Sequence, residues 1–169
     1  MSATIVMAYF IIVRGPLGVG KSTVSGKLAK ILHAEYVSVD RVLEKRGLAK
    51  TDSDYTPGDF IKANEYILPG MGTKLRKGKI VVFDGAFYFR KQIGHLIQNL
   101  NFPSFVFTLT APLKVCVERD RKRKNSYGKE ATTAVYKLVS RFDYGIAIDT
   151  NKKDVNKTVR EILSYLPKI

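Results

Sequence analysis

The sequence predicts one α/β domain, in which helices cover both faces of a parallel sheet. Short apolar runs of strand length alternate along the chain with longer segments of helical periodicity. The apolar runs are hydrophobic throughout rather than alternately polar, which is typical of parallel strands buried on both faces. The chain has 169 residues, about the size of one domain, and no repeat, low-complexity tract or long linker divides it.

The predicted elements follow one another in a regular order. The five strands are predicted at residues 8–13, 36–39, 79–83, 104–109 and 144–148. Apolar side chains at helical spacing predict helices over residues 24–32, 93–100 and 155–166. Two more helices are predicted to begin after Pro57 and after Pro112, and a further one covers residues 131–142.

The charge balance of the chain is strongly basic. Lys and Arg number 29 against 15 Asp and Glu, which gives a formal net charge of +14. This balance predicts attraction to polyanions, which include nucleotides, phosphorylated metabolites and nucleic acid, without choosing among them. Hydrophobic residues make up 45% of the chain and charged residues 26%, proportions that exclude a disordered tail protein.

Cysteine content and hydropathy point to a reducing compartment. Cys116 is the single cysteine, so a disulfide within the chain is excluded, and we expect this residue to pack in the core. The longest apolar stretch, residues 3–13, is too short to span a bilayer and lacks the features of a secretory signal. We therefore expect a cytoplasmic protein without membrane association.

The strongest chemical motif lies at residues 15–22, which read GPLGVGKS and match G-x-x-x-x-G-K-[ST] in full. The motif follows a predicted strand and opens a predicted helix, as phosphate binding requires. Its glycines let successive backbone N–H groups face phosphates, Lys21 reaches the β and γ phosphates, and the Ser22 hydroxyl binds Mg²⁺. The predicted nucleotide-binding residues here are Gly15, Gly18, Val19, Gly20, Lys21, Ser22 and Thr23.

Two predicted strands end on an aspartate, Asp40 and Asp84. In an open parallel sheet, ligands bind beyond the carboxyl ends of the strands. Asp84 closes the apolar run VVF and is predicted to support the magnesium ion, whereas a helix N-cap is the alternative role for either aspartate. Gly85 follows Asp84 in place of the glutamate that hydrolytic ATPases use to polarise water, so we expect phosphate transfer to an acceptor instead.

A basic helix–loop–helix is predicted after the fourth strand. The helix that begins after Pro112 ends in a cationic cluster, in which Arg119 and Arg123 are four residues apart and share a face. Residues 125–130 are predicted to form a mobile loop before the next helix. This arrangement predicts a lid over the phosphates. A solvated charge run or a patch for a nucleic-acid backbone is the alternative.

The succession of these motifs resembles the small P-loop kinases, which include adenylylsulfate kinase, chloramphenicol phosphotransferase, gluconate kinase and the kinase domain of polynucleotide kinase. The motif A-P-L-x-x-C-x-E-R-D-x-x-R at residues 111–123 is the most specific part of the resemblance, which runs from residue 10 to about residue 163. The resemblance implies a three-layer P-loop NTPase fold, with a five-stranded parallel sheet in order 2-3-1-4-5. It also implies a single kinase domain over residues 1–169 with a helical lid at about 119–134.

The resemblance also implies roles for individual residues. Asp40 would bind or deprotonate the acceptor hydroxyl, and Asp84 would support the metal or the acceptor. The remaining implied nucleotide contacts are Lys21 and Ser22 at the phosphates and metal, Arg119 against the adenine, Arg123 at the phosphates, and Thr150 and Asn151 beside the base.

The acceptor is left open by the sequence, because the acceptor motifs of adenylylsulfate and gluconate kinases are not reproduced. The candidate acceptor contacts are Asp40, Arg41, Asp59, Asn64, Glu65, Tyr88 and Arg90. Ordinary surface polarity is the alternative explanation for each of them.

Residues 151–154 spell N-K-x-D, the guanine-reading motif of GTPases. The D-x-x-G motif that should accompany it after the third strand is absent. We therefore expect Asp154 to cap the last helix and ATP to be favoured over GTP.

Two functions remain open at this point. The preferred one is a Mg²⁺-dependent kinase that transfers the γ-phosphate of ATP to a small molecule, a nucleotide or a nucleic acid. The alternative is a nucleotide-dependent nucleic-acid-binding protein with little turnover, and the oligomeric state is left open.

Overall fold

The computed structural model describes residues 7–168, so residues 3–6 of the long apolar stretch lie outside the described part. In chain order, the elements are β1 (Phe10–Arg14), α1 (Lys21–Ile31), β2 (Glu35–Ser38), α2 (Val39–Lys45), a 3₁₀ turn η1 (Asp52–Asp54), α3 (Pro57–Arg76), β3 (Val81–Asp84), α4 (Arg90–Leu100), β4 (Ser104–Thr110), α5 (Leu113–Arg121), α6 (Lys129–Val139), β5 (Ile146–Asp149) and α7 (Val155–Ser164). Each predicted strand is confirmed, with its ends shifted by a few residues.

The five strands form one parallel sheet in the order β2-β3-β1-β4-β5, which confirms the predicted fold class and strand order. β1 lies at the centre, where Phe10 pairs with Val81 of β3 on one side and with Ser104 of β4 on the other. The chain leaves β1 at the point where the strand order reverses. In sheets of this kind that point is where ligands bind.

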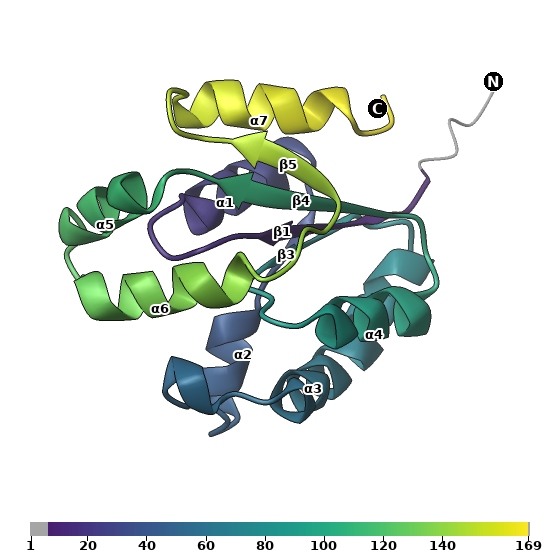
Figure 1. The fold of residues 1–169 in the computed structure, drawn as a ribbon. Coiled ribbons are helices and arrows are strands. Elements are labelled where there is room, and N and C mark those ends of the chain that lie inside the picture. The colour runs from purple at the N-terminus through teal and green to yellow at the C-terminus, as the bar shows by residue number, and fades with distance from the viewer. Residues whose placement is uncertain (1–6, 169) are drawn as a thin grey trace.

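Helices cover both faces of the sheet and produce two apolar layers (Figure 1). Because side chains alternate along a strand, Phe10 and Ile12 enter the layer made with α2, α3, α4 and α6. Ile11 and Val13 enter the opposite layer, made with α1, α5 and α7. Cys116 is fully buried in this second layer, which confirms its predicted packing role.

The carboxyl end of β1 holds a charged residue, Arg14, beyond the apolar run at residues 8–13. Arg14 is fully buried, and its guanidinium donates to the Val139 carbonyl at 2.8 Å and to the Thr108 hydroxyl at 3.2 Å. Burial lowers its pKa to about 10, and the nearby Arg90 acts in the same direction. Phe142, predicted within a helix, lies after the end of α6, and its ring contacts the Arg14 guanidinium at 4.4 Å.

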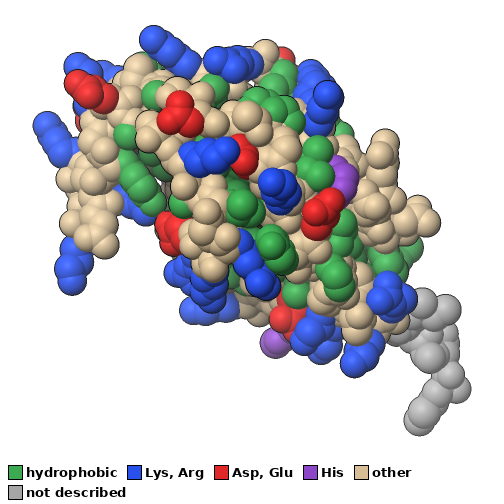
Figure 2. All heavy atoms as spheres, turned by 90° about the horizontal axis from the view of Figure 1, so that it is seen from below, with side chains coloured by type: hydrophobic (Ala, Val, Ile, Leu, Met, Phe, Trp, Pro, Cys, Tyr) green, Lys and Arg blue, Asp and Glu red, His purple; other side chains and the backbone are tan. Residues whose placement is uncertain are grey.

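Positive charge is spread over the face of the molecule that is seen from below. Figure 2 views the molecule from below, and Lys and Arg side chains surround that whole face with fewer acidic ones between them. None of the helices in the described part of the chain is long and apolar enough to cross a membrane.

Candidate functional site

The loop between β1 and α1 has the backbone geometry that its glycines permit. Gly18 has a φ of +76°, and a Cβ at this position would collide with the carbonyl oxygen of Cys116 in α5. Gly20 is the N-cap residue of α1 and has a φ of +100°. The loop therefore packs against α5 while it leads into a helix whose first N–H groups have no partner within the helix. Such a helix N-terminus favours the binding of phosphate.

Lys21 lies at the centre of this end of the sheet. It is 8% exposed, and its ammonium group donates to the Pro16 carbonyl at 2.8 Å. Burial lowers the pKa of Lys21, whereas the carboxylates of Asp84 and Asp40 act in the opposite direction and Arg123 lowers the pKa further. Charged side chains from α2, β3 and the lid region therefore all act on the charge of Lys21 in α1.

A cavity of about 240 Å³ opens at the start of α1. Its lining residues are Gly18, Gly20, Lys21, Ser22, Thr23, Arg119 and Arg123. Three of these are cationic, and the others are glycines and hydroxyl-bearing residues. The cavity is consequently suited to an anion with several oxygen atoms.

Asp84 and Ser22 supply oxygen donors at the same end of the sheet. Asp84 ends β3 and is 4% exposed, whereas Ser22 stands in the first turn of α1. A carboxylate and a hydroxyl beside a phosphate cavity fit Mg²⁺, which is usually held by one or two carboxylates together with substrate phosphates and water. The donor set of this chain therefore suits the metal that the sequence predicts.

The structure excludes the helix N-cap as the role of either aspartate. The N-cap residue of α2 is Ser38, whose hydroxyl accepts from the Arg41 N–H at 3.4 Å, and Asp40 lies in the helix that follows. The N-cap residue of the helix after β3 is Phe89, five residues beyond Asp84. That alternative is therefore wrong for both positions.

Sequence reasoning missed Tyr36, which contacts Asp84 directly. The Tyr36 hydroxyl donates to Oδ2 of Asp84 at 2.6 Å. Burial, followed by the hydrogen bond to Asp84 and its charge, raises the pKa of Tyr36, whereas the Ser22 side chain and Arg41 lower it. The pairing of β2 with β3 brings these two residues together. The contact could therefore be found from the strand register, but no local motif predicts it.

Arg119 joins three segments of the chain. Its guanidinium donates to the Thr150 hydroxyl at 2.9 Å, to the Thr150 carbonyl at 2.7 Å and to the Val19 carbonyl at 3.4 Å. These contacts connect α5 to the phosphate-binding motif at residues 15–22, called the P-loop below, and to the residue after β5. Arg119 also lines a second cavity of about 320 Å³ beside α1 and α7. The predicted contact of Arg119 with the adenine stays a prediction.

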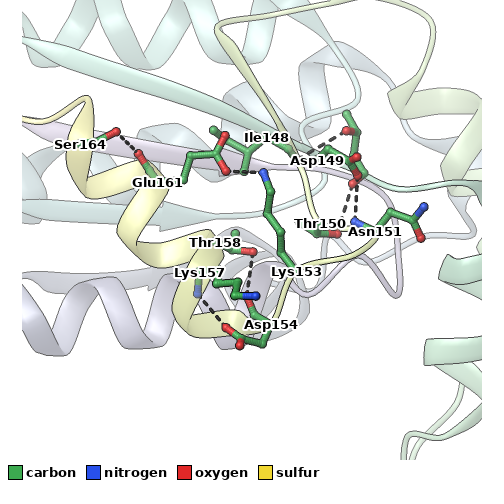
Figure 3. Close-up of polar contacts among 11 residues, drawn as sticks. Ile148, Asp149, Thr150, Asn151, Lys153, Asp154, Lys157, Thr158, Glu161 and Ser164 are labelled. Carbon is green, nitrogen blue, oxygen red and sulfur yellow. Dashed lines mark hydrogen bonds and ion pairs between the residues drawn. The ribbon is translucent and has the colours of Figure 1, made fainter.

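The N-K-x-D segment has a structural role in α7 (Figure 3). The Asp154 carboxylate accepts from the Lys157 N–H at 2.7 Å, which confirms that Asp154 caps this helix. Lys153, which precedes α7, pairs with Glu161 on that helix. Asp154, the residue of N-K-x-D that would read guanine in a GTPase, is consequently engaged within the protein.

The predicted lid consists of α5, a tight turn and α6. Asp120 is 1% exposed and accepts hydrogen bonds from the Ser126 hydroxyl at 2.7 Å and the Gly128 N–H at 3.0 Å. Burial raises the pKa of Asp120, but the hydrogen bonds from this turn and the Arg123 charge outweigh it, so the pKa is lowered overall. The predicted loop at 125–130 is wrong for its last two residues, because they belong to α6.

Asp40 and Arg41 are the candidate acceptor residues nearest the phosphate end. Both are exposed in the first turn of α2. The charge of Asp40 acts on the pKa of Lys21, and the charge of Arg41 acts on that of Tyr36. Neither residue lines the cavity at the start of α1, and their role as acceptor contacts stays a prediction.

Asp59 and Asn64 hold α3 in place. Oδ2 of Asp59 accepts from the Thr56 N–H at 2.8 Å in a capping box, and Oδ1 pairs with Lys50 at 2.8 Å. The Lys50 contact, followed by Thr56, lowers the pKa of Asp59 to about 2. Asn64 is fully buried and donates to the Gln92 carbonyl of α4 at 3.0 Å.

The three remaining acceptor candidates lie in different environments. Glu65 is exposed on α3. Tyr88 is 8% exposed, and its ring meets that of Phe60 at 5.3 Å between centroids. Arg90 donates to the Asp143 carbonyl at 3.0 Å. The role of these three residues as acceptor contacts stays a prediction.

Comparisons with known proteins agree with this architecture. Residues 10–142 match the family model AAA_33, described as an AAA domain. A protein of Pyrococcus furiosus named "Putative adenylate kinase" is 30% identical over 164 residues, which cover 92% of this chain and 83% of that protein. The predicted resemblance to small P-loop kinases is confirmed.

Solved kinase structures share the fold at low sequence identity. A sugar kinase of Janibacter sp. HTCC2649 superposes with a TM-score of 0.74 at 14% identity, covering 94% of each chain. The APS kinase CysC of Mycobacterium tuberculosis superposes with a TM-score of 0.72 at 13% identity, covering 94% of this chain and 96% of that one. A gluconokinase of Sinorhizobium meliloti 1021 has a TM-score of 0.66 at 20% identity, covering 91% and 89%.

Proposed function

The chain belongs to the AAA domain family AAA_33, and from this membership we propose that it is a Mg²⁺-dependent kinase that transfers the γ-phosphate of ATP to a small molecule. We propose that residues 1–169 act as a single kinase domain in the cytoplasm, with a lid at about 119–134. The observation that carries the proposal is the cationic cavity at the start of α1, which is lined by Lys21, Arg119 and Arg123. The carboxylates of Asp84 and Asp40 raise the pKa of this Lys21.

The P-loop side of this cavity would hold the nucleotide phosphates. Backbone N–H groups at the start of α1 would donate to the phosphate oxygens, and Lys21 would leave its Pro16 carbonyl partner to contact the β and γ phosphates. Ser22 and Asp84 would hold Mg²⁺, which supplies charge neutralisation on the phosphates when bound.

Transfer to an acceptor hydroxyl would use Asp40 as the base. As the acceptor oxygen bonds to the γ-phosphorus, its proton passes to the Asp40 carboxylate and the bond to the leaving oxygen of ADP breaks. An acceptor that is itself a phosphate needs no base. Arg119 and Arg123, which line the cavity, would stabilise the charge that develops on the phosphoryl group.

The nucleobase would lie in the second cavity, against Arg119 and beside Thr150 and Asn151. The cavity has room for a base, at about 320 Å³. Adenine is favoured over guanine, because Asp154 is engaged in capping α7.

The acceptor is best sought first among nucleoside monophosphates, because of the name of the Pyrococcus furiosus relative. Asp40 and the cationic Arg41 stand together in the first turn of α2, where they would suit a polar or anionic acceptor.

The test uses γ-labelled ATP with Mg²⁺ and a panel of nucleoside monophosphates, sugars, gluconate, adenylylsulfate and oligonucleotides. Label should pass to one small molecule with the wild type and not with Lys21→Ala. Label in oligonucleotides alone would make the acceptor a nucleic acid. The nucleic-acid-binding alternative, supported by the net charge of +14, would replace the proposal if no acceptor took label and oligonucleotide affinity fell steeply with salt.

A further inference from the structure

We propose that Tyr36 is a positioning residue of the magnesium site, whose phenol holds the Asp84 carboxylate in the orientation that supports the metal beside Ser22. This inference rests on the proposed function and adds a residue from β2 to it. Tyr36 would touch neither the nucleotide nor the acceptor and would act through Asp84.

The geometry of the contact follows from the strand register. Tyr36 pairs with Val82, whereas Ser38 is the partner of Asp84. The Tyr36 side chain therefore extends along the sheet by two residues before its hydroxyl meets Oδ2 of Asp84 at 2.6 Å. An O–H donor at this distance from a carboxylate is a short, charge-assisted hydrogen bond.

The surroundings of Asp84 explain why a donor is needed there. Asp84 is 4% exposed at the end of the buried strand β3. A buried carboxylate is costly unless hydrogen bonds or cations compensate for the lost water. The phenol occupies Oδ2 and restricts rotation of the carboxylate, which leaves Oδ1 in one defined orientation.

The neighbours of Tyr36 in β2 have ordinary packing and pairing roles. Val37 packs against the apolar layer on the side of α2 and α3, and Glu35 pairs with Lys74 at 2.9 Å. Tyr36 is 37% exposed, so its ring is not a core side chain. The Ser22 side chain lowers the pKa of this phenol, and Asp84 accepts its hydrogen bond.

Residues that orient a metal ligand by a hydrogen bond, without contacting the metal, have measurable effects on metal affinity. Their loss typically costs about 10–100-fold in metal affinity or activity. Removing only the Tyr36 hydroxyl should therefore weaken the response to Mg²⁺ while it spares the contacts that the P-loop makes with the nucleotide.

The experiment measures binding of the non-hydrolysable analogue AMPPNP by calorimetry over a series of MgCl₂ concentrations and in EDTA. For Tyr36→Phe we expect the half-saturating Mg²⁺ concentration to rise about 10-fold, with the affinity in EDTA unchanged. Tyr165→Phe is the matched control, because it removes a phenol hydroxyl at the end of α7 and should leave both values as in the wild type.

A double-mutant cycle with Asp84→Asn separates positioning from general destabilisation. If Tyr36 acts through Asp84, Tyr36→Phe should add little to the effect of Asp84→Asn on the half-saturating Mg²⁺ concentration. Additive effects, or a single Tyr36→Phe variant with wild-type Mg²⁺ dependence, would overturn the inference and leave the kinase proposal intact. Wild-type binding that is indifferent to Mg²⁺ would instead remove the metal from the proposed function, and this inference with it.

Discussion

The two ends of the proposed site differ in how their residues are brought together. At the nucleotide end, residues 15–22 form one continuous loop and helix start, to which Arg119 and Arg123 contribute from α5 and the turn after it. On the acceptor side, the candidates are divided among α2, α3, α4 and the loop before α4. Two of them, Asp59 and Asn64, make contacts that hold these helices in place.

This difference shows which kind of chemistry is encoded locally. A phosphate cradle needs consecutive N–H groups and a lysine at fixed spacing, so a short motif is sufficient to specify it. An acceptor site is assembled from segments that meet only in the folded chain. Asp59 and Asn64 illustrate the consequence, because their polar groups serve capping and packing in α3.

The largest expected effect is at the nucleotide end. Lys21→Ala should reduce phosphoryl transfer to background, because it removes the charge that would contact the β and γ phosphates. The labelled-ATP assay measures this, with Lys30→Ala as the control, since Lys30 is an exposed lysine in the last turn of the same helix. Near-normal turnover of Lys21→Ala would contradict the assignment of residues 15–22 as the phosphate-binding motif, and with it the contrast between the two ends.

The next effect tests whether Asp40 belongs to the reacting centre. Asp40→Asn should lower kcat by about 10²–10⁴-fold, as expected for loss of a general base, while ATP affinity stays nearly intact. The matched control is Glu44→Gln, an exposed acid on the same helix. Weakened ATP binding at a normal rate would instead place Asp40 in metal or nucleotide binding. If the acceptor proves to be a phosphate, this test loses its premise and Asp40 its role as base.

The third effect tests whether Arg123, which lines the phosphate cavity, acts in transfer or only in binding. Arg123→Ala should lower kcat by about 10²-fold with a smaller change in ATP affinity, if its guanidinium stabilises the transferred phosphoryl group. Steady-state kinetics and ATP binding are compared with those of Arg121→Ala, which removes an exposed arginine at the end of α5. Equal losses in rate and binding would make Arg123 an anchor for the ground state.

The smallest expected effect is on stability and concerns Asp59. Asp59→Asn should lower the free energy of unfolding by about 1 kcal/mol, because the capping box and the Lys50 contact are weakened. Kinase activity should be retained. Denaturant unfolding measures the first value, and a large loss of acceptor affinity without loss of stability would return Asp59 to the acceptor site.

The same residue predicts a pH dependence with a defined sign. The pKa of Asp59 is lowered to about 2 in the folded chain, below its ordinary value, so ionised Asp59 stabilises the fold at neutral pH. This contribution should be lost as the pH falls from about 4 towards 2. The difference in unfolding free energy between wild type and Asp59→Asn should therefore shrink over that range, and a constant difference would contradict the assignment.

Much of the fold was predictable from local pattern. Strands that are apolar throughout and helices with one apolar face are properties of short segments, so the five strands and the P-loop were found close to their observed positions. Asp154 was also predicted correctly, since a helix cap depends on residues only three positions apart. The ends of helices were less accurate, since Lys129 and Glu130, predicted in a loop, begin α6. The partners of the buried Arg14 guanidinium, such as the Val139 carbonyl, lie far along the chain, and no local pattern predicts them.

By itself, the sequence determined the fold class, the phosphate-binding motif and the aspartate that ends β3, because each depends on neighbouring residues. The second predicted strand-end aspartate, Asp40, lies instead in the first turn of α2. The tertiary structure alone decided that Tyr36 meets Asp84 across 48 positions, and that Asp120 closes the turn before α6. It also decided that Asn64 of α3 donates to the Gln92 carbonyl of α4. The physical reason is that hydrogen-bond partners of buried polar groups are set by strand register and helix packing, which no local spacing records.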